Sequence, residues 1–158
     1  MEGIEIIGIA GLIEKIEKTS KNIYEAEEIA EMLSVSEGTV YRSIRLFMLN
    51  AIQIETRYII TKRDLTAFLL DIETGKKTER DKAYKSDILE RIFFYYNPGR
   101  MLYDINTVAS SLHISETLLR NIVKKETIES VTIFSQLRIR AASLAKYLTH
   151  KQTFGIKE

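Results

Sequence analysis

An internal repeat is the feature that most constrains this 158-residue chain. A shift of 79 positions places Tyr24 on Tyr103 and Ser36 on Ser115 without a gap, and nine of 48 aligned positions between 23–70 and 102–149 are identical. Conservative pairs extend the match: Ile29/Val108, Val35/Ile114, Val40/Leu119, Ile44/Val123, Ile52/Val131 and Phe68/Tyr147. The alternative is two unrelated helical segments. Because apolar positions coincide throughout, we expect the two halves to share one fold.

Two short helices are predicted within the first copy. Apolar residues at Ala26, Ile29, Ala30 and Leu33 follow helical spacing and indicate an amphipathic helix over 25–33. Ser36 is a favoured N-cap for a second helix that runs to about Phe47, with Glu37 in its first turn. A three-residue turn between two such helices is typical of a helix-turn-helix.

A β-hairpin and a third helix complete the predicted unit. The β-prone runs Ala51–Ile54 and Arg57–Thr61 flank Glu55-Thr56 and indicate a two-stranded wing. Thr61 with Asp64 resembles a capping box before a last helix. The expected fold class is mainly α with small β-wings, arranged as two tandem winged helix-turn-helix units, each preceded by an extra helix.

The first copy resembles a known DNA-binding family. The stretch EAEEIAEMLSVSEGTVYRSIR, followed by RYIITKRDLTAFL, is similar to the excisionase-type winged helix-turn-helix, a relative of the MerR DNA-binding head, over about residues 23–70. The resemblance implies that the second helix enters the major groove while the wing touches backbone or minor groove. By position it implies DNA contacts from Ser36, Thr39, Tyr41, Arg42 and Arg45 on the helix and from Arg57 and Tyr58 on the wing. After the helix, Asn50 is the residue expected to adopt a left-handed conformation.

The second copy keeps the core spacing and carries its own polar face. Leu118 and Ile122 stand where the first copy has Thr39 and Ser43, so this helix is more apolar and we interpret it as degenerate. The remaining outward side chains suit phosphates and base edges: Thr117, Arg120, Asn121 and Lys124, with Arg138 and Arg140 in the wing.

The distribution of charge along the chain suggests the boundaries between the two units and their linker. Residues 1–79 hold 10 Lys+Arg and 14 Asp+Glu, a net charge of −4, whereas residues 80–158 hold 13 and 8, a net charge of +5. We expect a first unit over 1–72, a linker over 73–85 and a second unit over 86–158. The leading helices are predicted at Ile9–Ile16 and Ser86–Asn97, with a strand at Gly3–Ile7 as an alternative start. These helices, or Phe47-Met48-Leu49, are candidate contacts of a homodimer.

Several classes of function are disfavoured by the sequence. The chain has no cysteine, and His113 and His150 stand far apart, so neither a metal site nor another cofactor is expected. It holds no P-loop, no GxGxxG and no supported Ser/His/Asp arrangement, so we expect no enzyme. The apolar start, Ile4–Ile13, is too short for a membrane span and follows acidic Glu2, so a cytoplasmic location is expected and no membrane partner.

Sequence-specific binding of double-stranded DNA is the expected function, by a transcriptional regulator or an excisionase-like architectural factor. Two alternatives stay open: a plasmid or phage replication or partition factor, and a protein-interaction module that kept the winged fold without DNA binding. The acidic first half fits the last alternative.

Overall fold

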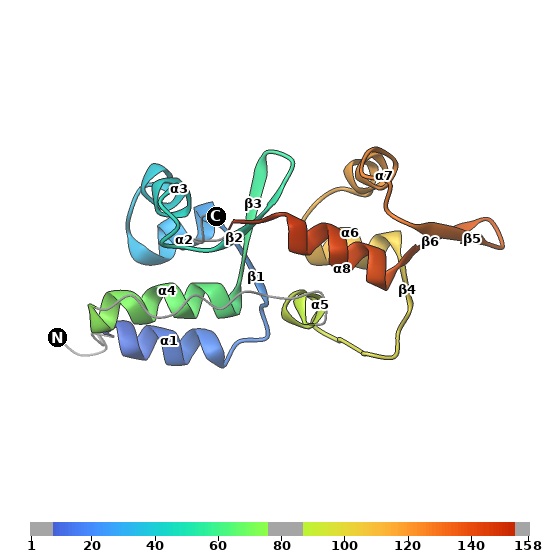
Figure 1. Ribbon diagram of the computed structural model, residues 1–158. Helices are drawn as coiled ribbons and strands as arrows, with labels where there is room; N and C mark the ends of the chain where they lie inside the picture. The colour runs from blue at the N-terminus through green and yellow to red at the C-terminus, as the bar shows by residue number, and fades with distance from the viewer. Residues whose placement is uncertain (1–7, 76–86, 154–158) are drawn as a thin grey trace.

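The computed structural model describes residues 8–75 and 87–153 (Figure 1). The first half contains α1 (Ile9–Glu17), β1 (Ile23–Glu25), α2 (Ala26–Leu33), α3 (Glu37–Arg45), β2 (Ala51–Ile54), β3 (Arg57–Thr61) and α4 (Lys62–Thr74). The second half contains α5 (Ile88–Ile92), β4 (Leu102–Asp104), α6 (Ile105–Leu112), α7 (Glu116–Lys125), β5 (Ser130–Ile133), β6 (Gln136–Arg140), α8 (Ala141–His150) and β7 (Gln152–Thr153). Helices and small antiparallel sheets thus make up the fold, and the predicted hairpin strands are confirmed at their residue bounds.

The order helix, strand, helix, helix, strand, strand, helix occurs in both halves at an offset of 79 residues. α2 and α6 are 79 residues apart at both ends. The strand pairing repeats as well: Tyr24 faces Ile60 in one sheet, and Tyr103 faces Ile139 in the other. The similarity that the sequence shows between the halves therefore reaches the register of the strands.

Local sequence explains where the paired helices begin and end. Ser36 and Ser115 each cap a helix by accepting a hydrogen bond from the amide three residues later. The preceding helices both stop at a left-handed residue, Ser34 with φ 56° and His113 with φ 59°. The tight turn between α2 and α3 thus recurs between α6 and α7.

The two faces of the β1–β3–β2 sheet pack against different cores, because side chains alternate along a strand. One face lies in the first core, which is defined as Ile16, Tyr24, Ala26, Ile29, Ala30, Val40, Ile44, Leu49, Ala51, Ile60, Leu65, Phe68 and Leu69. The other face, with Ile23, Ile52, Ile54 and Ile59, joins the apolar residues of 88–148 in one cluster, which we name the shared core. The first half's sheet is therefore buried on both sides.

The end of the second half also pairs with the first. β7 adds to the free edge of β2, so the sheet has the order β1-β3-β2-β7. The Gln53 amide donates to the Lys151 carbonyl at 2.8 Å, and the Ala51 amide donates to Thr153 Oγ1 at 2.9 Å. Strand pairing and a common core thus connect the halves.

The leading and connecting segments differ from the prediction. The helix expected over Ser86–Asn97 spans only Ile88–Ile92, because Phe93 turns extended and stacks on Tyr103 with ring centroids 4.6 Å apart. α4 continues to Thr74 and ends at Gly75, φ 71°, so the predicted linker begins later than residue 73. Most of that linker, and the alternative strand at Gly3–Ile7, lie outside the described residues.

The turn after α3 also differs. The left-handed residue is Phe47, φ 60°, and not Asn50, which is buried. The amides of Met48 and Leu49 both donate to the Ser43 carbonyl, which turns the chain inward and buries Leu49 completely. Of the expected contact surface Phe47-Met48-Leu49, Leu49 therefore belongs to the first core. Within residues 8–75 and 87–153, no helix combines the length and apolar character that crossing a membrane requires.

Candidate nucleic-acid interface

The α3 helix presents two cations on its solvent face. Arg42 and Arg45 are exposed, while Val40 and Ile44 on the opposite face are buried. Neither arginine forms an ion pair with any residue of 8–75 or 87–153. At the start of the helix, Ser36 and Thr39 are exposed and their hydroxyl oxygens lie 2.9 Å apart. The arginines are thus free to bind a ligand, whereas the two hydroxyls already take part in the helix cap.

Tyr41 lies one helical turn before Arg45 on α3 and is half-buried. Its ring packs against Tyr58 of β3, with centroids 6.0 Å apart. Burial raises the pKa of the Tyr41 hydroxyl, and the carboxylates of Glu27 and Glu37 raise it further. Tyr41 and Tyr58 therefore meet at an acidic, half-buried part of the surface beside Arg45.

The β2–β3 hairpin contacts the second half through its tip. Arg57 Nη1 donates to the His113 carbonyl at the end of α6, over 2.6 Å. Glu55 pairs with Lys125 at the end of α7, with Oε1 and Nζ 3.5 Å apart. We name the contact of this hairpin with α6, α7, α8 and β7 the seam. Arg57, which the resemblance assigns to a DNA-contacting wing, is held in the seam.

The α7 helix separates its apolar and polar residues onto opposite faces. Ile122 belongs to the shared core, Leu118 packs against it, and both follow the positions of Thr39 and Ser43 by 79 residues. The other face exposes Thr117, Arg120, Asn121 and Lys124. The apolar substitutions that we interpreted as degeneration thus have a packing role, and they leave the polar face intact.

The second hairpin brings one further cation toward α7. Arg138 is half-buried and donates to the Leu137 carbonyl and to Gln136, while exposed Arg140 lies 3.5 Å from Glu129. An open groove of about 620 Å³ runs between this hairpin and the start of α7, and Arg120 and Arg138 both line it. The structure therefore joins Arg138 to the α7 face and keeps Arg140 outside the groove.

Both cationic helices lie on one side of the molecule. In Figure 1, α3 and α7 lie along the upper edge, and the β2–β3 hairpin rises between them. Arg45 and Lys124 occupy equivalent, exposed positions on the two helices. A long polyanion along this edge could contact both helices.

A second group, at the seam, was not singled out by the sequence. Ligand atoms of Glu25, Glu28 and His113 lie within 4.8 Å of one another, each side chain being half-buried. His113 Nδ1 is 3.3 Å from Glu25 Oε2, and Glu28 accepts from the Glu25 amide and from Lys21. Burial opposes ionisation of Glu28, but these hydrogen bonds outweigh it and lower its pKa. Since internal partners already occupy these oxygens, the group acts as a helix cap and a link between the halves.

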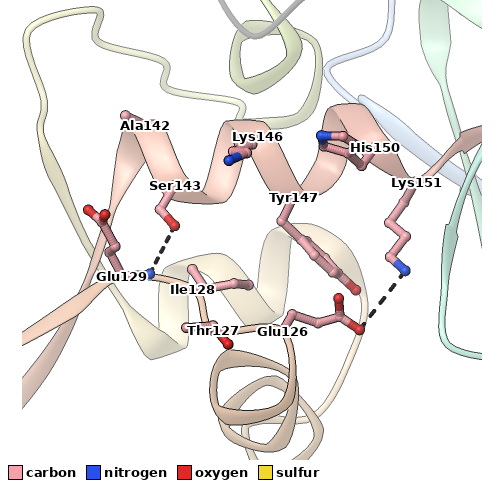
Figure 2. Close-up of a pocket in the computed structure, with 10 residues that line it drawn as sticks. All are labelled: Glu126, Thr127, Ile128, Glu129, Ala142, Ser143, Lys146, Tyr147, His150 and Lys151. Carbon is pink, nitrogen blue, oxygen red and sulfur yellow. Dashed lines mark hydrogen bonds and ion pairs between the residues drawn. The ribbon is translucent and has the colours of Figure 1, made fainter.

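One pocket in the described part of the chain lies between α8 and the turn after α7 (Figure 2). Its volume is about 700 Å³. Ser143 Oγ accepts from the Glu129 amide at 2.9 Å, and Lys151 lies 4.0 Å from Glu126. His150 is seven residues from Ser143 on the same helix, about 10 Å along the axis. Ser143 and His150 thus do not form a nucleophile–base pair.

Tyr147 in this pocket gives a testable pH dependence. Burial, with Glu126 and Glu55 nearby, raises the pKa of its hydroxyl to about 12. The folded state then holds this proton more tightly than the unfolded state, so the free energy of unfolding should fall between about pH 10 and 12, by roughly 2–3 kcal/mol from this group. Tyr147→Phe should reduce that fall in urea titrations. Tyr95→Phe, at a side chain 84% exposed, is the control, and an equal effect of both would contradict the assignment.

Comparison with known proteins returned no match: neither a protein-family model, nor a curated protein, nor a solved structure is similar to this chain.

Proposed function

We propose that this protein binds double-stranded DNA through the polar faces of α3 and α7. The observation that carries the proposal is a pair of N-capped helices, each following a tight turn, with cations at equivalent exposed positions, Arg45 and Lys124, that form no ion pair with any described residue. Arg42, Arg120 and Asn121 extend these faces and match the side chains that read base edges and phosphates in a major groove.

The proposed interface differs from that of a free winged unit. Arg57 and Tyr58 are engaged within the protein. The proposal therefore gives the first hairpin the role of joining the two halves at the seam, and not that of contacting DNA. The groove with Arg120 and Arg138 leaves the second hairpin as the wing that approaches the backbone. The resemblance to excisionase-type proteins supports a regulatory or architectural role on DNA, with a replication or partition factor as the alternative.

The salt dependence of binding tests the proposal. The target would first be selected from a random duplex pool, and affinity would then be measured by fluorescence anisotropy at increasing salt. We expect the logarithm of the association constant to fall with the logarithm of salt by ~0.9 for each phosphate contacted. The pair Arg120→Ala with Lys124→Ala should flatten this slope, because two phosphate partners are removed. Lys146→Ala, on the exposed face of α8, should leave it unchanged.

A protein-interaction module is the second candidate, favoured by the acidic side chains around Tyr41. No binding to any duplex at low salt, or binding that does not respond to salt, would support this candidate against the first.

A further inference from the structure

The seam joins the hairpin of the first half to the helices of the second half. The reverse contact is not made within the chain, so the hairpin of the second half and the helices of the first half each keep a surface that no described residue covers. The first half gives its hairpin to the second half, where Ile52 and Ile54 are buried in the shared core. The corresponding hairpin of the second half carries Val131 and Ile133, which are 39% and 43% exposed. The same face of the same hairpin is thus covered in one half and open in the other.

Phe134 at the tip of this open hairpin is the most unusual exposed residue. Its side chain is 94% exposed, and its backbone has φ 48°, a conformation that bulky residues rarely adopt. The first half has Glu55 at the equivalent tip, with φ 57°, and that residue reaches Lys125 across the seam. A phenylalanine here strains the backbone, and its ring remains in water unless a partner covers it.

A matching groove is open in the first half. It has a volume of about 420 Å³ and lies between α1, α2, α3 and α4, with a mostly apolar lining that includes Val35, Thr39, Ser43 and Phe68. The residues 79 positions later are Ile114, Leu118, Ile122 and Tyr147, and all four pack in or against the shared core that holds Ile52 and Ile54. The first half therefore keeps, unoccupied by any described residue, the groove that in the second half receives a hairpin.

We propose that the β5–β6 hairpin of one copy of this chain docks into this groove of another copy. The seam is the precedent for the contact, since it joins the same two surfaces within one chain. The residues exchanged at the tip fit: where the seam pairs Glu55 with Lys125, the contact between copies would place Phe134 near Leu46, which is 55% exposed. Ser34 would stand in the place of His113, with the same left-handed backbone.

This contact is head-to-tail, because different surfaces of the two copies meet. It therefore builds either a closed ring of copies, of which a reciprocal two-fold dimer is the smallest, or an open chain. It covers the Thr39 and Ser43 side of α3, as the seam covers Leu118 and Ile122 of α7, and leaves Arg42 and Arg45 exposed. The inference does not depend on DNA binding and is tested without DNA.

Sedimentation velocity over a concentration series of the full chain tests the proposal. Two variants each remove one surface. Phe134→Asn suits the left-handed backbone of the tip, and Ile72→Lys places a charge at a 47% exposed residue of the mostly apolar lining. We expect the parent to associate as concentration rises. The association constant of each variant should be lower by roughly tenfold or more. Tyr95→Ser, at an exposed aromatic outside both surfaces, should behave as the parent.

Mixing the two variants distinguishes the proposal from other modes of association. The Phe134→Asn chain keeps its groove and the Ile72→Lys chain keeps its hairpin, so the mixture should form a one-to-one dimer that grows no further. Thermal melting of each variant checks that both are folded. A parent that stays monomeric throughout would overturn the proposal. A second outcome would also overturn it: Phe134→Asn abolishes association, Ile72→Lys leaves it unchanged, and adding the Phe134→Asn chain does not alter the association of the Ile72→Lys chain. That pattern indicates hairpins pairing with each other.

Discussion

Ile54→Asp should destabilise the protein by roughly 4 kcal/mol or more, whereas Ile133→Asp, at the equivalent position of the second half, should change the free energy of unfolding by less than about 1 kcal/mol. The Ile54 side chain is fully buried in the shared core, and Ile133 is 43% exposed. An unpaired carboxylate at position 54 must lose its hydration or take up a proton, whereas one at position 133 stays in water.

Urea unfolding followed by circular dichroism, at a concentration low enough to keep the chain monomeric, measures both variants. Because Ile54 lies in the core of the second half while its strand belongs to the first, we expect one cooperative transition that moves as a whole. Ile54→Ala and Ile133→Ala repeat the comparison without a charge, with an expected loss of about 2–5 kcal/mol only for the buried site. Equal losses at the two sites would mean that the hairpin is not packed between the halves.

The short-range features of this fold could be predicted from the sequence. Helical spacing located α2, and the N-cap preference of serine located the start of α3 at Ser36; the repeat aligns Ser36 with Ser115, which caps α7. Runs of β-prone residues located the hairpin strands. These features depend on residues within one or two turns of each other, so local patterns are sufficient to find them.

The seam could not be predicted in this way, because it joins residues about 60 to 100 positions apart in the sequence. Its signal was present in the differences between the copies. Leu118 and Ile122 replace hydroxyl residues on one helix, and Arg138 replaces Ile59 on one hairpin. We interpreted the first change as loss of a DNA-reading face. In the structure Leu118 and Ile122 pack in or against the shared core, which also holds the apolar face of the first hairpin.

The sequence predicted which helix residues of the candidate interface are exposed, but not that the first hairpin is engaged within the protein. The resemblance implied exposed positions for Arg42 and Arg45, and the core spacing of the second copy placed Arg120, Asn121 and Lys124 on its outward face; the structure has all five exposed. The sequence could not show that Arg57 reaches a carbonyl of α6, because the position of a hairpin relative to another unit is not encoded in its own alternation.

Removal of the two α3 arginines should have the largest effect on recognition. Bidentate contacts to base edges contribute ~1–3 kcal/mol each to discrimination, so Arg42→Ala with Arg45→Ala should weaken binding to the selected site by about tenfold to a hundredfold or more. Random duplex should lose much less, because the first half carries a net charge of −4 and contributes little to non-specific attraction. The comparison is made by anisotropy on both duplexes at one salt concentration.

The matched pair on α7, Arg120→Ala with Lys124→Ala, should produce the opposite pattern. The second half has a net charge of +5, and its exposed cations would chiefly contact phosphates, so binding to selected and random duplex should weaken by similar factors. All four side chains lie outside the two cores, so each double variant should melt as the parent does. If the α3 pair weakens both duplexes equally, α3 does not read bases. If the α7 pair alone abolishes the preference for the selected site, the roles of the two helices are reversed.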